Sequence, residues 1–195
     1  MEEYIHMIIT GKRHTAEIVQ DNDPLNPREE FDHCCTMACW HRRYNLGDKH
    51  EWRSPTEMMC ELLFDAGIPG ADGYTMDEDE FEERFENGSE DPVALLREKG
   101  VIMTELYLYD HSGLTVSTGG FTCQWDSGQI GWVIMTPKRF KEAMGREWAG
   151  TPEDIEWAEG CIEAEVEEYD QYLTGDVWGI RIKDEYDEEV ESCWP

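Results

Sequence analysis

Basic residues are scarce in this chain. Its 195 residues include 16 Lys and Arg against 45 Asp and Glu, which gives a formal net charge of -29 at pH 7. Affinity for nucleic acid comes mainly from Lys and Arg side chains that neutralise phosphates, and attraction to anionic membrane surfaces depends on the same side chains. The composition therefore disfavours direct binding of nucleic acid or membrane, and it favours a positively charged protein partner.

Long apolar runs and a positively charged leader are also missing. No apolar run approaches the roughly 20 residues that a membrane-spanning helix requires, and residues 1–6 carry acids where a signal peptide carries basic residues. The seven cysteines are odd in number and irregularly spaced, which is typical of free thiols in a reducing compartment. We therefore expect a cytoplasmic protein without membrane segments.

The motifs of common cofactor sites are absent. The sequence contains no Walker A motif, no dinucleotide-binding glycine loop, no H-E-x-x-H and no EF-hand, so no cofactor is expected. Cys35, Cys39 and His41 are metal-ligand residue types, and the two cysteines would share one face of a helix expected over 31–44. Structural zinc sites normally pair such a cluster with a second one of standard spacing. This chain lacks the second cluster, so buried thiols are the favoured interpretation.

Hydrophobic residues make up 39% of the chain and aromatic residues 11%, which indicates a packed core rather than a disordered acidic tail. The patterns predict an α+β fold with a central antiparallel sheet over 101–136, joined by a strand over 177–183 and flanked by amphipathic acidic helices. A hairpin is expected over 1–19. We expect residues 1–195 to form a single domain, in which 54–99 is a candidate helical acidic insertion.

The helix expected from Thr151 has the clearest signals. Thr151 suits the N-cap, Pro152 the first helical position and Asp154 the capping box, and Gly175 suits the position just after the helix. Its apolar residues recur at helical spacing: Ile155, Ala158, Ile162, Val166, Tyr169 and Leu173. Shorter helices are expected from Ser54, over 92–99 and over 137–148.

The acidic residues are clustered rather than spread. Residues 77–91 hold nine, 151–173 hold nine and 184–191 hold six. The helix from Thr151 has no Lys or Arg to form an i,i+4 ion pair, and its later acids approach the helix end where negative charge is unfavourable. A surface that keeps such a pattern is often functional. We expect partner contacts at Glu156, Glu163, Glu167 and Asp170, with a second set at Asp77, Glu78, Asp79, Glu80, Glu83 and Glu86.

An enzymatic alternative rests on three residues in the middle of the chain. Cys123, His111 and Asp126 are the residue types needed for a thiol nucleophile, its base and an orienting carboxylate. The segments 110–113 and 126–128 that surround them are also typical of hairpin turns held by side-chain hydrogen bonds. A small cysteine-dependent hydrolase is therefore the alternative to a protein without enzymatic activity.

Five segments carry a resemblance to a known family: 26–29 (NPRE), 40–48 (WHRRYNLGD), 107–113 (YLYDHSG), 123–129 (CQWDSGQ) and 172–179 (YLTGDVWG). Through them the chain resembles a family of uncharacterised acidic proteins of bacteriophages and mobile elements. The resemblance covers most of the chain and implies a phage setting, hence the cytoplasm of an infected bacterial host. In composition the chain is also similar to the antirestriction and anti-CRISPR proteins of phages that mimic DNA.

These observations lead to one main hypothesis. We expect a DNA-mimicking inhibitor that binds the basic groove of a DNA-binding protein in a host defence system, either a restriction or a CRISPR system. A helix with carboxylates at roughly 5 Å intervals offers the kind of regular negative charge that a duplex carries. Besides the hydrolase, a phage adaptor or regulator that binds another basic protein is a further alternative, and its binding would not compete with DNA. The sequence leaves the oligomeric state open.

Overall fold

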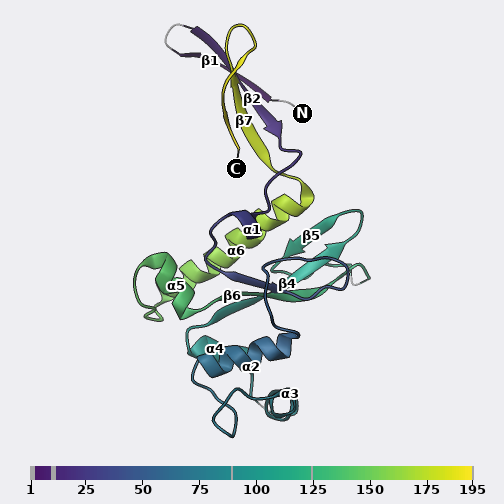
Figure 1. The fold of residues 1–195 in the computed structure, drawn as a ribbon, viewed down its shortest axis with the longest axis vertical. Coiled ribbons are helices and arrows are strands. Elements are labelled where there is room, and N and C mark those ends of the chain that lie inside the picture. Colours follow the sequence, from purple (N-terminus) through teal and green to yellow (C-terminus); the bar gives the residue numbers. More distant parts are fainter. Residues whose placement is uncertain (1–2, 10–11, 89, 124, 195) are drawn as a thin grey trace.

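The computed structural model describes residues 3–9, 12–88, 90–123 and 125–194, without the side chains of residues 3–9, 12–13 and 86. Within these residues the chain forms an α+β fold with two antiparallel four-stranded sheets, and the predicted fold class is confirmed. One sheet, the body sheet, lies among the helices, and the other, the arm sheet, projects from this body (Figure 1). No described helix combines the length and apolar character needed to cross a membrane.

The body sheet has the strand order β3-β6-β4-β5, with all neighbours antiparallel. Its strands are β3 (Thr36–Cys39), β4 (Ile102–Asp110), β5 (Leu114–Ser117) and β6 (Ser127–Met135). The last three confirm the sheet predicted over 101–136. They are rich in β-branched and aromatic residues, which pack well on a pleated surface.

Helices cover both faces of the body sheet. The long helix α6 (Pro152–Thr174) shares one hydrophobic core with Leu106 and Val133. The helices α2 (Pro55–Asp65) and α4 (Pro92–Glu98) share a second core with strand residues that include Met103 and Ile134. Successive residues of a strand point to opposite faces, so the body has three layers, with α6 on one side of the sheet and α2 and α4 on the other (Figure 1).

Local sequence signals set the ends of α6 as predicted. The Thr151 side chain accepts the N–H of Asp154, and the Asp154 side chain accepts the N–H of Thr151, which completes the capping box. Gly175, with a φ of 73°, ends the helix in the left-handed region that favours glycine. The remaining helices are α1 (Pro27–Glu30), α3 (Glu78–Phe81), the π-helix η1 (Glu82–Glu86) and α5 (Pro137–Met144).

The arm sheet consists of the two ends of the chain and has the order β1-β2-β7-β8. Its strands are β1 (Glu3–Ile9), β2 (Lys12–Gln20), β7 (Trp178–Lys183) and β8 (Glu189–Cys193). The described residues confirm the N-terminal hairpin. The strand expected over 177–183 exists, but the prediction that it joins the central sheet is wrong, because it pairs with β2. Just before it, the N–H of Asp21 donates to the carbonyl of Val177 at 2.8 Å, which extends the pairing of the two segments by one residue.

The helix expected over 31–44 is also wrong. The short helix α1 ends at Glu30, and the segment that follows contains strand β3, which pairs with β6. Met37 and Ala38 are both buried, one in each of the two cores. A strand buried on both faces shows a continuous apolar run without alternation, which a short sequence pattern does not separate from a buried helix.

Candidate functional site

The outer face of α6 carries a row of unpaired carboxylates, which we call the α6 face. It is defined by Glu156, Glu163 and Glu167, which are all exposed, and among the described residues none of them has an ion-pair partner. With a rise of 1.5 Å per residue, the first two lie about 10 Å apart along the helix and the next two about 6 Å apart. Their exposure agrees with the helical periodicity, and their contact with a partner stays a prediction. The other side of the helix is buried in the core, which holds the row in place.

Other acids of α6 serve the fold. Asp154 is fully buried, and its carboxylate accepts a hydrogen bond from Arg146 at 2.5 Å and another from the N–H of Ala149 at 3.0 Å. The hydrogen bond from Arg146 is the main cause that holds the pKa of Asp154 below its ordinary value. Glu159 pairs with Arg97 at 2.5 Å. Not every acid of this helix is therefore available to a partner.

Asp170 is a correction to the expected contact set. Its Oδ1 accepts the backbone N–H of Val116 in β5 at 2.8 Å, so the half-buried side chain is bound to the body sheet. Burial raises the pKa of Asp170, and the hydrogen bond from Val116 opposes that shift. An edge strand needs a partner for its free N–H groups, and Asp170 supplies one here.

The second predicted set lies around α3 and η1. Asp77 caps α3 by accepting the N–H of Glu80, and Glu80 in turn accepts the N–H of Ala71. Glu78 accepts the hydroxyl of Ser54 at 3.1 Å. Asp79 and Glu83 are exposed, and the side chain of Glu86 lies outside the described residues. This set packs with α2, across the body sheet from α6, so the two predicted acidic sets do not form one surface.

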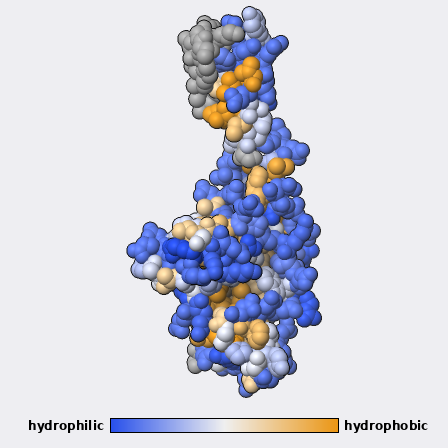
Figure 2. All heavy atoms as spheres, turned by 60° about the vertical axis from the view of Figure 1, so that its left-hand side comes forward, coloured by the Kyte–Doolittle hydropathy of each residue, from blue (hydrophilic) through white to orange (hydrophobic). Residues whose placement is uncertain are grey.

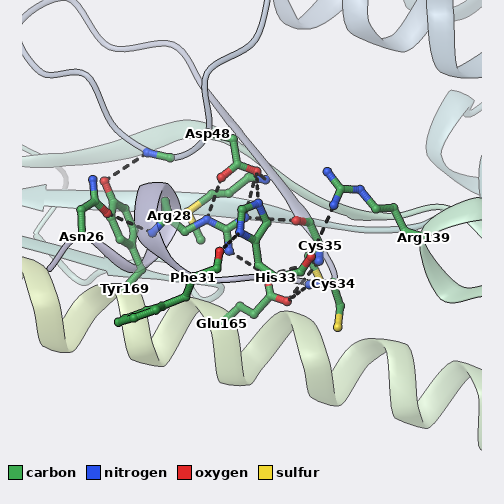
Figure 3. Close-up of polar contacts among 12 residues, drawn as sticks. Asn26, Arg28, Phe31, His33, Cys34, Cys35, Asp48, Arg139, Glu165 and Tyr169 are labelled. Carbon is green, nitrogen blue, oxygen red and sulfur yellow. Dashed lines mark hydrogen bonds and ion pairs between the residues drawn. The ribbon is translucent and has the colours of Figure 1, made fainter. Parts of the chain in front are cut away.

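A buried ion network fastens the α6 layer to the segments before and after β3 (Figure 3). The Arg28 guanidinium donates to both oxygens of Asp48 at 2.8 Å, to Glu165 Oε2 at 2.7 Å and to the carbonyl of Cys35 at 3.1 Å. The other oxygen of Glu165 accepts the N–H of Cys34 at 2.6 Å. Burial alone would lower the pKa of Arg28, but Asp48 and Glu165 outweigh it and raise this pKa. The network was not predicted from the sequence, although Arg28 lies in the segment 26–29 and Asp48 in the segment 40–48 that carry the family resemblance.

The three residues of the enzymatic alternative do come together. The thiol of Cys123 donates to Asp126 Oδ2 at 3.7 Å, and His111 Nδ1 lies 3.2 Å from the same oxygen. The carboxylate therefore stands between the thiol and the imidazole, whereas a triad needs the imidazole between the other two groups. The His111 side chain is 62% exposed. This arrangement does not favour nucleophilic catalysis.

The cysteines near the start of the body lie on strand β3 and in the segment just before it. Among the residues that the structure describes, no group of three or more His, Cys, Asp and Glu is arranged to hold a metal ion. Cys39 ends strand β3, and Cys35 comes just before it, so the expected shared helix face does not exist. Burial raises the pKa of the Cys39 thiol to about 12 and also raises that of Cys35. Cys35 is part of the hydrophobic core that α6 shares, and Cys39 packs against it, which is the arrangement expected of buried thiols.

The described surface also has an apolar groove that sequence analysis missed. It has a volume of about 480 Å³ and lies where the loop before α1, the end of α6 and the start of β7 meet. The signal in the sequence was a set of aromatic residues next to turns, in segments far apart along the chain.

Comparison of the chain with protein-family models, curated proteins and solved structures gives no match.

Proposed function

We propose that this protein is a DNA-mimicking inhibitor, and that its α6 face occupies the basic DNA-binding groove of a host restriction or CRISPR enzyme. The supporting observation is the unpaired row of Glu156, Glu163 and Glu167 on a helix with no Lys or Arg of its own. Exposed like charges in one row repel each other and would be relieved by a basic partner. The resemblance to acidic phage proteins supports the same setting.

The spacing of the free carboxylates on α6 determines how closely the helix matches the phosphates of a DNA duplex. The helix has 23 residues and is therefore about 34 Å long. Its five acids without an ion pair or a backbone partner among the described residues are Glu153, Glu156, Glu163, Glu167 and Glu168. This is about one charge per 7 Å, whereas a duplex carries one per about 1.7 Å of axis. The helix thus stands in for the phosphates that basic side chains contact, and not for every phosphate of a duplex.

The test is displacement of DNA from purified defence enzymes. A panel of restriction endonucleases and CRISPR effectors is loaded with a fluorescent duplex, and the protein is titrated in while the anisotropy is followed. The proposal predicts that the duplex is released from at least one enzyme and that its cleavage stops. If every enzyme keeps its duplex, the proposal fails. Binding of an enzyme without release of DNA would instead indicate the adaptor or regulator alternative.

The hydrolase alternative is tested in parallel with Cys123→Ala. A cysteine hydrolase would lose its activity in this variant, whereas an inhibitor that acts through α6 keeps its full potency. The interposed Asp126 carboxylate and the exposed His111 favour the inhibitor.

A further inference from the structure

The apolar groove lies beside the α6 face, at the neck between the body and the arm sheet. Figure 2 shows a largely hydrophilic surface with hydrophobic residues on the arm, at the neck and on the lower part of the body. The walls of the groove include three aromatic side chains, Phe31, Tyr172 and Trp178. Phe31 is 39% exposed and Trp178 40% exposed. Leu25, which is 57% exposed, lines the same groove, and exposed apolar side chains that lie together in this way are typical of an interaction surface.

The charge around the groove indicates what it binds. Its lining contains the carboxylates Glu168 and Asp176 and, among the described residues, no Lys or Arg. Asp176 Oδ1 accepts the indole N–H of Trp178 at 2.7 Å, which holds this carboxylate beside the aromatic ring. Glu168 has no partner within the described chain. Aromatic walls next to two carboxylates, one of them without a partner in the described chain, suit a cation that also has an apolar part.

The groove continues into the α6 face. A shallower hollow on α6 shares Glu168 and Gln171 with the groove and extends to Glu167. A partner that covers Glu167 therefore also reaches the mouth of the groove. Within an interface, anchoring residues are typically buried in such a pocket, and arginine is among the most frequent of them.

We propose that the groove seats an arginine side chain of the basic partner, an inference that builds on the function proposed above. The planar guanidinium stacks on aromatic rings and pairs with carboxylates through a fixed set of donors, while its methylene stem covers apolar surface. A lysine ammonium is compact and strongly hydrated, so it gains less from aromatic walls. In the DNA complex of the partner, the same arginine would contact a phosphate.

The test uses two fluorescent nonapeptides of equal charge, one with arginine and one with lysine at every basic position, titrated against the full chain. We expect the arginine peptide to bind about fivefold more tightly, and Trp178→Ala to remove this preference.

Trp125→Ala is the matched control, because Trp125 is 95% exposed and lies outside the groove. Since Trp178 begins a strand, Glu168→Gln serves as a second variant that leaves the strand intact and should weaken arginine binding.

Equal binding of the two peptides, or a preference that survives both groove variants, would overturn the groove assignment. The DNA-displacement assay separates this failure from failure of the proposed function. If the wild type and Trp178→Ala release duplex equally well, the groove assignment falls and the inhibitor function stands. If the wild type releases no duplex from any enzyme but its arginine preference depends on Trp178, the inhibitor function falls and the groove assignment stands.

Discussion

Arg28 connects three segments that are distant in the chain, and its side chain is only 2% exposed. Removing one member of a buried ion network leaves uncompensated charges, here those of Asp48 and Glu165. We expect Arg28→Ala to lower the free energy of unfolding by about 3–5 kcal/mol, as measured by urea denaturation. The control is Arg42→Ala, because Arg42 is exposed. This substitution should change the free energy of unfolding by less than about 0.5 kcal/mol. A loss below about 1 kcal/mol for Arg28→Ala would contradict this role.

Asp154 gives a prediction about pH. Its pKa in the folded state lies below the ordinary value of 3.8, chiefly because of the hydrogen bond from Arg146. Its ionised form therefore contributes stability that is fully present above pH 3.8 and is lost as the pH falls through the folded-state pKa. We expect the stability difference between the wild type and Asp154→Asn, from urea midpoints, to be largest at neutral pH and to shrink in strong acid. A difference that stays constant over the whole range would be the contrary result.

At the scale of elements, two glycines of α6 make a matched pair. Gly160 lies inside the helix and Gly175 ends it with a φ of 73°, and an added Cβ would meet no atom within 4 Å at either position. Gly160→Ala should raise the free energy of unfolding by about 0.5–1 kcal/mol, because alanine favours helix. Gly175→Ala should lower it by about 1–2 kcal/mol, because a side chain is strained in the left-handed region. Thermal unfolding of both variants measures this, and shifts of the same sign would refute it.

The elements also show what could be predicted from the sequence. The capping box of α6 and its final glycine are local signals, which is why both ends of this helix were predicted. Strand β3 was missed, because Met37 and Ala38 are buried on opposite faces and leave no alternation. The partner of β7 could not be predicted, because β2 lies more than 150 residues earlier in the chain and apolar patterns do not specify which strands pair.

In the candidate site, too, local features could be predicted from the sequence and contacts between distant segments could not. Glu156, Glu163 and Glu167 follow from helical periodicity alone, so their exposure was predictable. Asp170 has a similar spacing, but its role depends on the free N–H of Val116 in a strand that periodicity does not locate. The groove could not be predicted, because Phe31, Tyr172 and Trp178 meet only when the fold brings their segments together.

For the whole molecule, the net charge of -29 opposes the folded state through self-repulsion, which salt screens. We therefore expect the melting temperature to rise as sodium chloride is increased from about 0.01 M to about 0.15 M. A gain of about 1 kcal/mol would correspond to about 2–4 °C for a chain of this size. Replacing the salt by potassium chloride should give the same shift. A melting temperature that falls over this range would show that attraction, not repulsion, dominates the surface.

The body sheet separates the acids of α6 from those of α3 and η1, so a single groove in a partner is expected to contact one layer. Two charge-reversal variants with equal change in net charge therefore test whether the partner binds the α6 face. The α6 variant carries Glu156→Lys, Glu163→Lys and Glu167→Lys, and the control carries Asp79→Lys, Glu82→Lys and Glu83→Lys, all at exposed positions.

The decisive measurement is release of a fluorescent duplex from the enzyme that the wild type inhibits, with both variants checked for folding by circular dichroism. If the α6 face occupies the DNA-binding groove, the α6 variant loses at least about 100-fold in potency, because like charges placed across an interface cost several kcal/mol. The control should stay within a few-fold of the wild type. An α6 variant that releases the duplex as well as the wild type does would show that the α6 face does not bind the groove.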